Sequence, residues 1–390
     1  MPVDNSAIIF EEKKINVLLE YLVRTRVLLA GKQALFALSL LGLVTGIVAG
    51  MVIVLFRYST EYAQMSFLPA ADPENYEALN WQVRLLIASA GGLLLGLLFH
   101  FISRVPLRVG VIHVLERLSY HEGNLPLRNL VLQFIGAIVA ITSGQSIGRE
   151  GPSVHLGAAS ASLMGQYLHL PNNSIRTLVG CGAAAAIAAS FNTPLAGVIF
   201  AMEVILMEYT ITGFTPVILS AVSATVVSRL VFDTEPLISI HIVDLHSFLE
   251  LPIIILMGLF IGSIAAGFIR LTEIITKFGL KFDIWLRMTL AGIGVGLIGI
   301  VSPEIMGIGY DTVDVVILGQ LGISALLLIL VAKLLATSLC VGFSIPAGLI
   351  GPAIFMGAIA GGVVGELVEQ FSNGFSDAAF YVLFGMGAMM

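Results

Sequence analysis

Long runs of apolar residues, separated by short segments rich in glycine and proline, dominate this chain of 390 residues. Two of the runs, Leu35 to Phe56 and Leu85 to Ile102, are long enough to cross a bilayer as helices. The same pattern predicts helical segments near residues 33–57, 82–103, 128–143, 153–166, 175–190, 194–209, 215–232, 249–276, 284–301, 323–340, 352–367 and 377–390. It lacks the ten-residue alternation of an outer-membrane barrel. It therefore predicts an all-α integral membrane protein.

Glycine and proline interrupt many of these helices before they reach the length of a full span. The segments SGQSIGREGP at 143–152 and VGFSIPAGLIGP at 341–352 are two such interruptions. Irregular backbone at membrane depth is tolerated only where it is buried in protein or lines a cavity. We therefore expect broken, tilted helices around a site inside the membrane.

The two interruptions share a framework that indicates an internal repeat. GREGPSVHLGA at 148–158 and GLIGPAIFMGA at 348–358 have glycine, proline and alanine at the same five positions. Short, interrupted segments at matching positions of two halves are typical of inverted repeats with a transport site between them. We predict a first transmembrane repeat at 33–232 and a second at 249–390. The second ends sooner after its framework, so it is expected to be incomplete at the C-terminus.

Composition and charge agree with a membrane protein and predict its orientation. Hydrophobic residues make up 57% and charged residues 11% of the chain, against about 25% charged in soluble domains. Basic residues precede the first apolar run, and a loop with Glu61, Asp72, Glu74 and Glu77 is expected to follow it. The positive-inside rule then places the N-terminus in the cytoplasm. Residues 1–32 are expected to form a cytoplasmic amphipathic segment of a multi-pass protein of the cell's inner (plasma) membrane.

Glu150 is the main candidate for chemistry. A helix that starts at Gly151–Pro152 has unpaired N–H groups and the positive end of its dipole there. Two such starts, one from each half, can bind an anion without a full positive charge. Because the Glu150 carboxylate is itself a tethered anion, it can block this site or be protonated and swing away. The alternative is an ion pair between Arg149 and Glu150 that holds a turn.

These motifs resemble the CLC family of chloride channels and chloride/proton exchangers. The segments that carry the resemblance are GREGP, NTPLAGVIFAMEV at 192–204 and GLIGP, the last in place of the family's GxFxP motif. The resemblance implies a homodimer in the lipid bilayer with a pore in each subunit, gated from outside by Glu150. It also implies an external anion site at the amides of Arg149, Glu150 and Gly151, and a central site at those of Leu349 and Ile350.

The chain departs from the family at the first anion motif. Where the family has GSGIP, residues 108–112 read RVGVI. Gly110 is kept, but Val109 stands where a serine hydroxyl would hold the central anion. We therefore expect the anion site to include Val109 and Gly110 but to lack that hydrogen bond, with weaker affinity and weaker preference for chloride over nitrate.

The inner proton site of the exchangers is also changed. Alignment through PLAG places Val204 at the position of the family's inner glutamate, and Glu203 one residue earlier. One residue turns a helix by about 100°, so Glu203 is expected to face elsewhere. Glu203 and His155 are the candidates for a proton pathway. For His155, the alternative is an ordinary core or interface group.

The function predicted from these residues is chloride transport through a CLC-type pore with weak or no proton coupling. The alternatives are a chloride/proton or a fluoride/proton antiporter, although fluoride-type relatives usually carry threonine where this chain has Pro152. A non-conducting anion sensor or fragment is an alternative of another class. We predict no enzyme, no cofactor besides the transported anion, no metal site and no nucleic-acid partner, because no nucleotide loop, nucleophile triad or zinc spacing is present.

Overall fold

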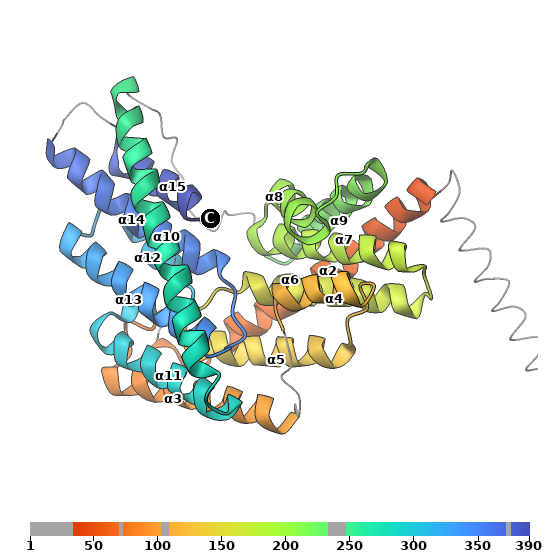
Figure 1. Cartoon of the computed structure of the whole chain (residues 1–390), viewed down its shortest axis with the longest axis horizontal. Helices are drawn as coiled ribbons and strands as arrows, with labels where there is room; N and C mark the ends of the chain where they lie inside the picture. Colours follow the sequence, from red (N-terminus) through yellow and green to blue (C-terminus); the bar gives the residue numbers. More distant parts are fainter. Residues whose placement is uncertain (1–33, 70–72, 103–108, 233–246, 372–375) are drawn as a thin grey trace, which may run out of the picture. The chain divides into compact units, whose positions relative to one another are not determined.

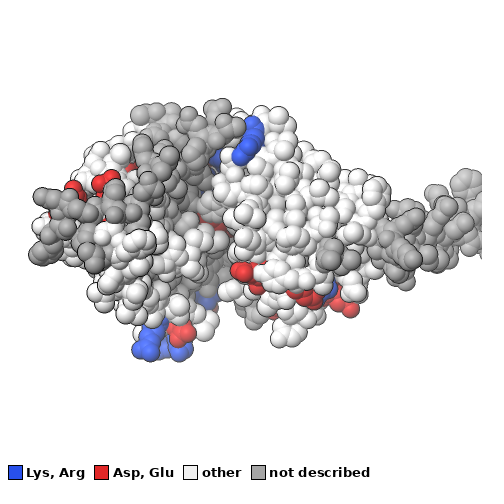
Figure 2. Space-filling model, turned by 90° about the horizontal axis from the view of Figure 1, so that it is seen from above, with Lys and Arg blue, Asp and Glu red and all other residues white. Residues whose placement is uncertain are grey.

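The computed structural model describes residues 34–69, 73–102, 109–232, 247–371 and 376–390. Within these ranges the chain is helical, and its one β feature is an isolated bridge between Gly148 and Gly348. Seven of the described helices are long and apolar enough to cross a membrane. Most of the described surface in Figure 2 carries neither acidic nor basic side chains. The predicted all-α membrane architecture is confirmed, while the predicted segment 1–32 lies outside the described residues.

The helices follow one another in the same order in the two halves of the chain (Figure 1). The first half has α2 (Ala34–Met65), α3 (Trp81–Ile102), α4 (Val111–Tyr120), α5 (Leu127–Thr142), α6 (Glu150–Tyr167), α7 (Asn172–Phe191), α8 (Pro194–Phe200), the π-helix η2 (Ala201–Leu206) and α9 (Ile211–Arg229). The second has the 3₁₀ turn η3 (Phe248–Glu250), α10 (Leu251–Gly279), α11 (Ile284–Val301), the 3₁₀ turn η4 (Pro303–Ile305), α12 (Tyr310–Ile317), α13 (Ile323–Gly342), α14 (Ile350–Phe371) and α15 (Ala378–Met389).

Four elements differ from the sequence prediction. Helix α2 continues to Met65, so that Glu61 lies on a helix and not in the following loop. The predicted helix 194–209 changes from α- to π-helical at Ala201. Helices α4 and α12 were not predicted, because they are short and carry polar residues on one face, which hides them from a search for long apolar runs.

The described chain forms two compact units that cut across the two halves of the sequence. Among the described residues, one unit comprises 34–54, 111–130 and 153–232. The other comprises 55–69, 73–102, 109–110, 131–152, 247–371 and 376–390. The GREGP segment up to Pro152 and its second-half counterpart belong to this second unit, which therefore contains the candidate site.

The packing of α3 against α11 confirms the inverted repeat. The two helices lie side by side in Figure 1. Gly92 lies against the Met288 carbonyl, and Gly292 lies against the Ala88 carbonyl, each too close for a side-chain carbon. Residues 92 and 292, and residues 88 and 288, differ by 200 positions, so the repeat turns each contact into the other. The same shift of 200 relates the two glycine–proline frameworks. A two-fold axis between halves requires this reciprocity.

In the other unit, small residues allow close helix packing. Most of α7 is buried, including an uninterrupted run from Leu178 to Ser190. Gly157 of α6 and Gly182 of α7 each face the carbonyl oxygen of the other. Such contacts between glycines bring helix backbones together where the hydrophobic effect is absent.

Candidate functional site

The two glycine–proline segments meet at equivalent residues. The amide nitrogens of Gly148 and Gly348 each donate to the carbonyl oxygen of the other, both over 2.9 Å. The turn before each glycine contains a left-handed residue, Gly144 with φ +71° and Ser344 with φ +66°. The reciprocal bonds hold the start of α6 beside the start of α14.

The Glu150 carboxylate lies at this junction and accepts hydrogen bonds from two donors of the second half. The Tyr310 hydroxyl donates to Oε1 over 2.7 Å, and the Gly351 amide nitrogen donates to Oε2 over 3.2 Å. Glu150 is 0% exposed. The carboxylate therefore takes the place of an anion at the first turn of α14, where a helix offers unpaired N–H groups.

Two glycines leave the space that this carboxylate occupies. A side-chain carbon on Gly148 would collide with Oε2 of Glu150. One on Gly351 would lie 3.2 Å from both carboxylate oxygens. Absence of a Cβ at these positions lets a carboxylate approach the backbone closely.

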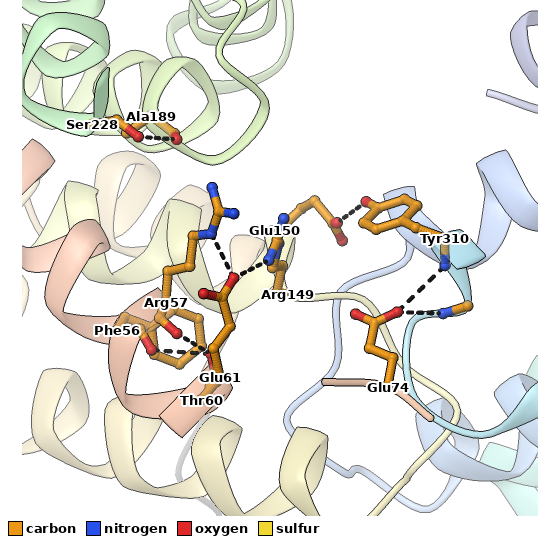
Figure 3. Close-up of polar contacts among 11 residues, drawn as sticks. Phe56, Arg57, Thr60, Glu61, Glu74, Arg149, Glu150, Ala189, Ser228 and Tyr310 are labelled. Atoms are coloured by element: carbon orange, nitrogen blue, oxygen red, sulfur yellow. Dashed lines mark hydrogen bonds and ion pairs between the residues drawn. The ribbon is translucent and has the colours of Figure 1, made fainter. Parts of the chain in front are cut away.

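Tyr310 is positioned by the start of α12. Gly309, with φ +87°, precedes this helix and lets the chain turn into it. The Glu74 Oε2 atom accepts from the amide nitrogens of Gly309 and Tyr310, over 3.2 and 3.4 Å (Figure 3). Glu74 thus caps the start of α12. Tyr310, the first residue of α12, donates to the second carboxylate, Glu150.

Glu74 has an unusual protonation equilibrium for a loop carboxylate. The pKa of Glu74 is raised to about 7, chiefly by burial and also by the charge of nearby Asp311. The positive charge of Arg149 and the two backbone hydrogen bonds lower the pKa of Glu74 and offset part of that effect. Glu74 therefore changes charge near neutral pH.

Arg149 points to a different carboxylate from the one beside it in sequence. Its Nη1 lies 3.7 Å from Oε1 of Glu61, which also accepts from Nε of Arg57 over 2.6 Å. The Arg149 guanidinium lies 5.8 Å from the centre of the Tyr310 ring. Figure 3 shows that Glu150 turns toward Tyr310 and away from Glu61. The geometry favours the anion-mimic interpretation of Glu150 over an Arg149–Glu150 pair.

A cavity of about 200 Å³ lies beside this cluster. Its charged and hydroxyl-bearing lining residues are Arg57, Thr60, Glu61, Glu74, Arg149, Tyr310 and Asp311. The cavity therefore lies next to the Glu150 carboxylate, on the side of Arg149 and Tyr310.

The other predicted anion-site residues lie at or near the two helix starts. Gly151 follows Glu150 in the first turn of α6 and is buried against Ala347 and Gly348. Ile350 begins α14, with Leu349 directly before it. The second-half amide that bonds the carboxylate is that of Gly351, the residue after Ile350. The predicted anion site at the amides of Leu349 and Ile350 stays a prediction.

Val109 and Gly110 stand directly before α4, as Gly309 stands before α12. Gly110 has φ +81°, and both residues are partly exposed. The described hydrogen bonds to the Glu150 carboxylate come from Tyr310 and Gly351, and not from Val109 or Gly110. Their predicted contact with a transported anion stays a prediction.

The two candidates for a proton pathway lie in the other compact unit. His155 is buried in α6, where its Nε2 lies 2.9 Å from Nδ1 of His113. The side chain of Asn129 lies 3.2 Å from Nε2 of His113. Glu203 is exposed on the π-helix and hydrogen-bonds the Tyr209 hydroxyl. Their part in proton transfer stays a prediction.

Tyr310 and Glu74 were missed in the sequence, although a signal for Tyr310 exists. The repeat shift of 200 carries the anion motif at 108–112 onto residues 308–312, which read IGYDT. That comparison would have placed Tyr310 at the start of a helix facing the site. Glu74 has no such counterpart, and only the fold brings it to the amide of Tyr310.

Comparisons with known proteins identify the family of this chain. Residues 91–390 match the sequence model described as voltage gated chloride channel. A ClcB-like protein of Ralstonia nicotianae is 31% identical over 80% of this chain and 75% of the relative. Chloride channel protein CLC-f of Arabidopsis thaliana is 29% identical over 91% of this chain and 49% of the relative. The H(+)/Cl(-) exchange transporter ClcA of Vibrio cholerae is 29% identical, over 67% and 58%. The chain spans less than two thirds of the last two relatives.

Solved structures show the same fold. A slow cyanobacterial Cl⁻/H⁺ antiporter matches with a TM-score of 0.77 and 22% identity, over 90% of this chain and 84% of that one. A CLC-type fluoride/proton antiporter matches with a TM-score of 0.75 and 24% identity, over 92% and 87%. At these identities the likeness establishes the fold alone. With the family match over residues 91–390, the chain belongs to the voltage gated chloride channel family.

Proposed function

We propose that this protein moves chloride across a membrane through a pore gated by Glu150. The observation that carries the proposal is the position of the Glu150 carboxylate, held by the Tyr310 hydroxyl and the Gly351 amide at the start of α14. Donors that hold a carboxylate there can hold a chloride ion once the carboxylate has left. A few neutral donors also bind weakly enough for the ion to leave again.

Protonation provides the opening step. A protonated Glu150 has lost the charge that two donors stabilise, so it can leave the site and admit an anion. The anion flux should then rise as the pH falls. The transported anion is the only ligand that this mechanism needs, and it requires neither a cofactor nor enzymatic chemistry.

We expect little or no stoichiometric proton countertransport, because Val204 occupies the position of the inner proton acceptor. Proton-coupled exchange is the second candidate. It is favoured by the similarity to relatives that are named as H(+)/Cl(-) exchangers and to a structure titled as a fluoride/proton antiporter. The working unit is proposed to be a homodimer in the cell's inner membrane, with the N-terminus in the cytoplasm.

Anion efflux from liposomes between pH 4 and pH 8 tests the gate. The wild-type flux should fall as the pH rises. Glu150→Gln keeps the size of the side chain and removes its ionisation, so its flux should be high and independent of pH. A Glu150→Gln variant that keeps the wild-type response would exclude Glu150 as the gate. Absence of flux from both proteins would favour the non-conducting alternative.

A further inference from the structure

Lys333 is a buried charge that the proposed gate does not yet explain. It lies in the middle of α13, a helix of twenty residues whose other side chains are uncharged, and it is 0% exposed. An ammonium group buried in this way costs free energy unless hydrogen bonds replace its water. Ionisable groups inside membrane segments are therefore candidates for function.

Three carbonyl oxygens of one short segment take up the three donors of Lys333. Its Nζ donates to Ile305 over 3.1 Å, to Gly307 over 3.2 Å and to Ile308 over 3.1 Å. In the described part of the chain, Nζ forms no ion pair. The Phe355 ring lies on another side of the ammonium, with its centre 4.4 Å from Nζ. The lysine thus binds backbone and holds segment 305–308 in place.

That segment leads directly into Tyr310, the donor to Glu150. Lys333 fixes carbonyls on the N-terminal side of Gly309, while Glu74 fixes the amides of Gly309 and Tyr310 (Figure 3). In this turn, Lys333 therefore binds the backbone carbonyl groups and Glu74 binds the backbone N–H groups. The Tyr310 hydroxyl, on the residue that follows this turn, lies 2.7 Å from Oε1 of Glu150.

The first half of the chain has no such cation. A shift of 200 residues relates Lys333 on α13 to Gln133 on α5. Gln133 is 0% exposed, and neither its Nε2 nor its Oε1 has a hydrogen-bond partner among the described residues. A buried lysine therefore occupies this repeat position only in the second half, the half that supplies Tyr310.

We propose that Lys333 is a positioning residue of the Glu150 gate, which acts by holding segment 305–308 so that Tyr310 donates to the ionised Glu150 carboxylate. This inference rests on the proposed function for its effect on flux, but its effect on the turn before α12 is independent of transport.

Several charged or titratable groups surround the two ends of this arrangement. Those close to Lys333 are Glu74, Asp311 and Cys340. Those close to Tyr310 are Glu150, Arg149 and Glu74, and Glu61 and Arg57 lie behind Arg149. These groups remain in a Lys333 variant but lose the field of its positive charge. A double variant with Tyr310→Phe therefore separates the positioning effect from a purely electrostatic one.

The pH profile of anion efflux tests the coupling through Tyr310. Loss of the lysine should favour the protonated Glu150 carboxyl, so Lys333→Met should move half-maximal flux to higher pH by about one to two units. The shift in Lys333→Met/Tyr310→Phe should equal the larger single shift, because both changes remove the same hydrogen bond. Additive shifts, or a lower flux with an unchanged midpoint in Lys333→Met, would overturn the proposal.

Amide hydrogen exchange tests the positioning role of Lys333 without a measurement of transport. In Lys333→Met the amides of 307–312 should exchange about tenfold faster or more. Lys333→Arg, which keeps a cation and several donors, should exchange more slowly than Lys333→Met. Lys281→Met removes an exposed lysine after α10 and should change nothing. Unchanged amide exchange in Lys333→Met would refute the positioning role, even if the wild-type protein conducts anions. Faster exchange in Lys333→Met, together with a wild-type protein that shows no flux, would support the positioning role but contradict the proposed function. If Lys333→Met does not fold, Lys333→Gln is measured with the same expectations.

Discussion

The Tyr310 hydroxyl donates to the Glu150 carboxylate over 2.7 Å, and each residue is the first of its helix, α12 and α6. The bond joins the second half of the chain to the first at the start of two helices. A hydrogen bond to an ionised group is worth about 1.5–3 kcal/mol. The charged, blocking state of Glu150 therefore depends on a residue 160 positions away in sequence.

Tyr310→Phe should open the gate at a higher pH than in the wild-type protein. Removal of the hydroxyl withdraws a donor from the ionised carboxylate, so half-maximal flux should move upward by about one to two pH units. Anion efflux from liposomes over a pH series measures the shift. Tyr381→Phe is the matched control, since it removes a hydroxyl that donates to Glu250. Equal midpoints in Tyr310→Phe and wild type would contradict the prediction.

Gly148→Ala should displace the Glu150 carboxylate. The added methyl group would collide with Oε2, the movable end of a side chain, and would lie 3.0 Å from Cδ of Pro352. We expect the carboxylate to leave its site and the flux at pH 8 to rise toward that of Glu150→Gln. Gly322→Ala is the control, because a Cβ at Gly322 meets no atom within 4 Å. A low flux at pH 8 with normal folding would mean that the carboxylate tolerates the methyl group.

Glu74→Gln should flatten the pH dependence of stability between about pH 4.5 and pH 7. The pKa of Glu74 is raised from 4.5 to about 7 in the folded protein, chiefly by burial. The folded state therefore binds more protons than the unfolded state in this window, and stability falls as the pH rises through it. Thermal unfolding in detergent at pH 4.5 and pH 8 measures the change. The difference in Tm should be smaller in Glu74→Gln than in wild type.

The exposed Glu273 of α10 offers a control for this measurement. Glu273→Gln should keep the wild-type difference in Tm between the two pH values. If Glu74→Gln also kept it, the carboxylate of Glu74 would have to titrate as an ordinary exposed acid, contrary to its burial beside the start of α12.

The sequence pattern was sufficient for the repeat and for the position of Glu150, but not for what holds Glu150. The shared framework at 148 and 348 predicted two converging helix starts, because glycine and proline have strong local effects. Tyr310 lies in a short helix with Asp311 beside it, which does not look like a membrane segment. Its role depends on a contact across the repeat, and local patterns carry no such information.

Charged residues show the same limit. Glu61 was expected in a loop, but α2 continues past it and brings Arg57 alongside, one turn earlier. Lys333 stands alone in an apolar run and could have been noticed as an intramembrane charge. Its partners could not have been predicted, since they are backbone carbonyls of a segment with no distinguishing side chains.

Coupling of the anion flux to proton movement requires more than the gate. Two acceptors are needed to carry protons against an anion, one at each side. Glu150 can serve as the outer one, but Val204 cannot titrate. Glu203 lies on the π-helix, exposed and bonded to Tyr209, in the other compact unit. We expect a chloride gradient to drive little or no uphill proton movement in liposomes that contain a pH-sensitive dye. Chloride-driven proton pumping would show this expectation to be wrong, and its loss in Glu203→Gln, but not in Glu208→Gln, would identify Glu203 as the inner acceptor.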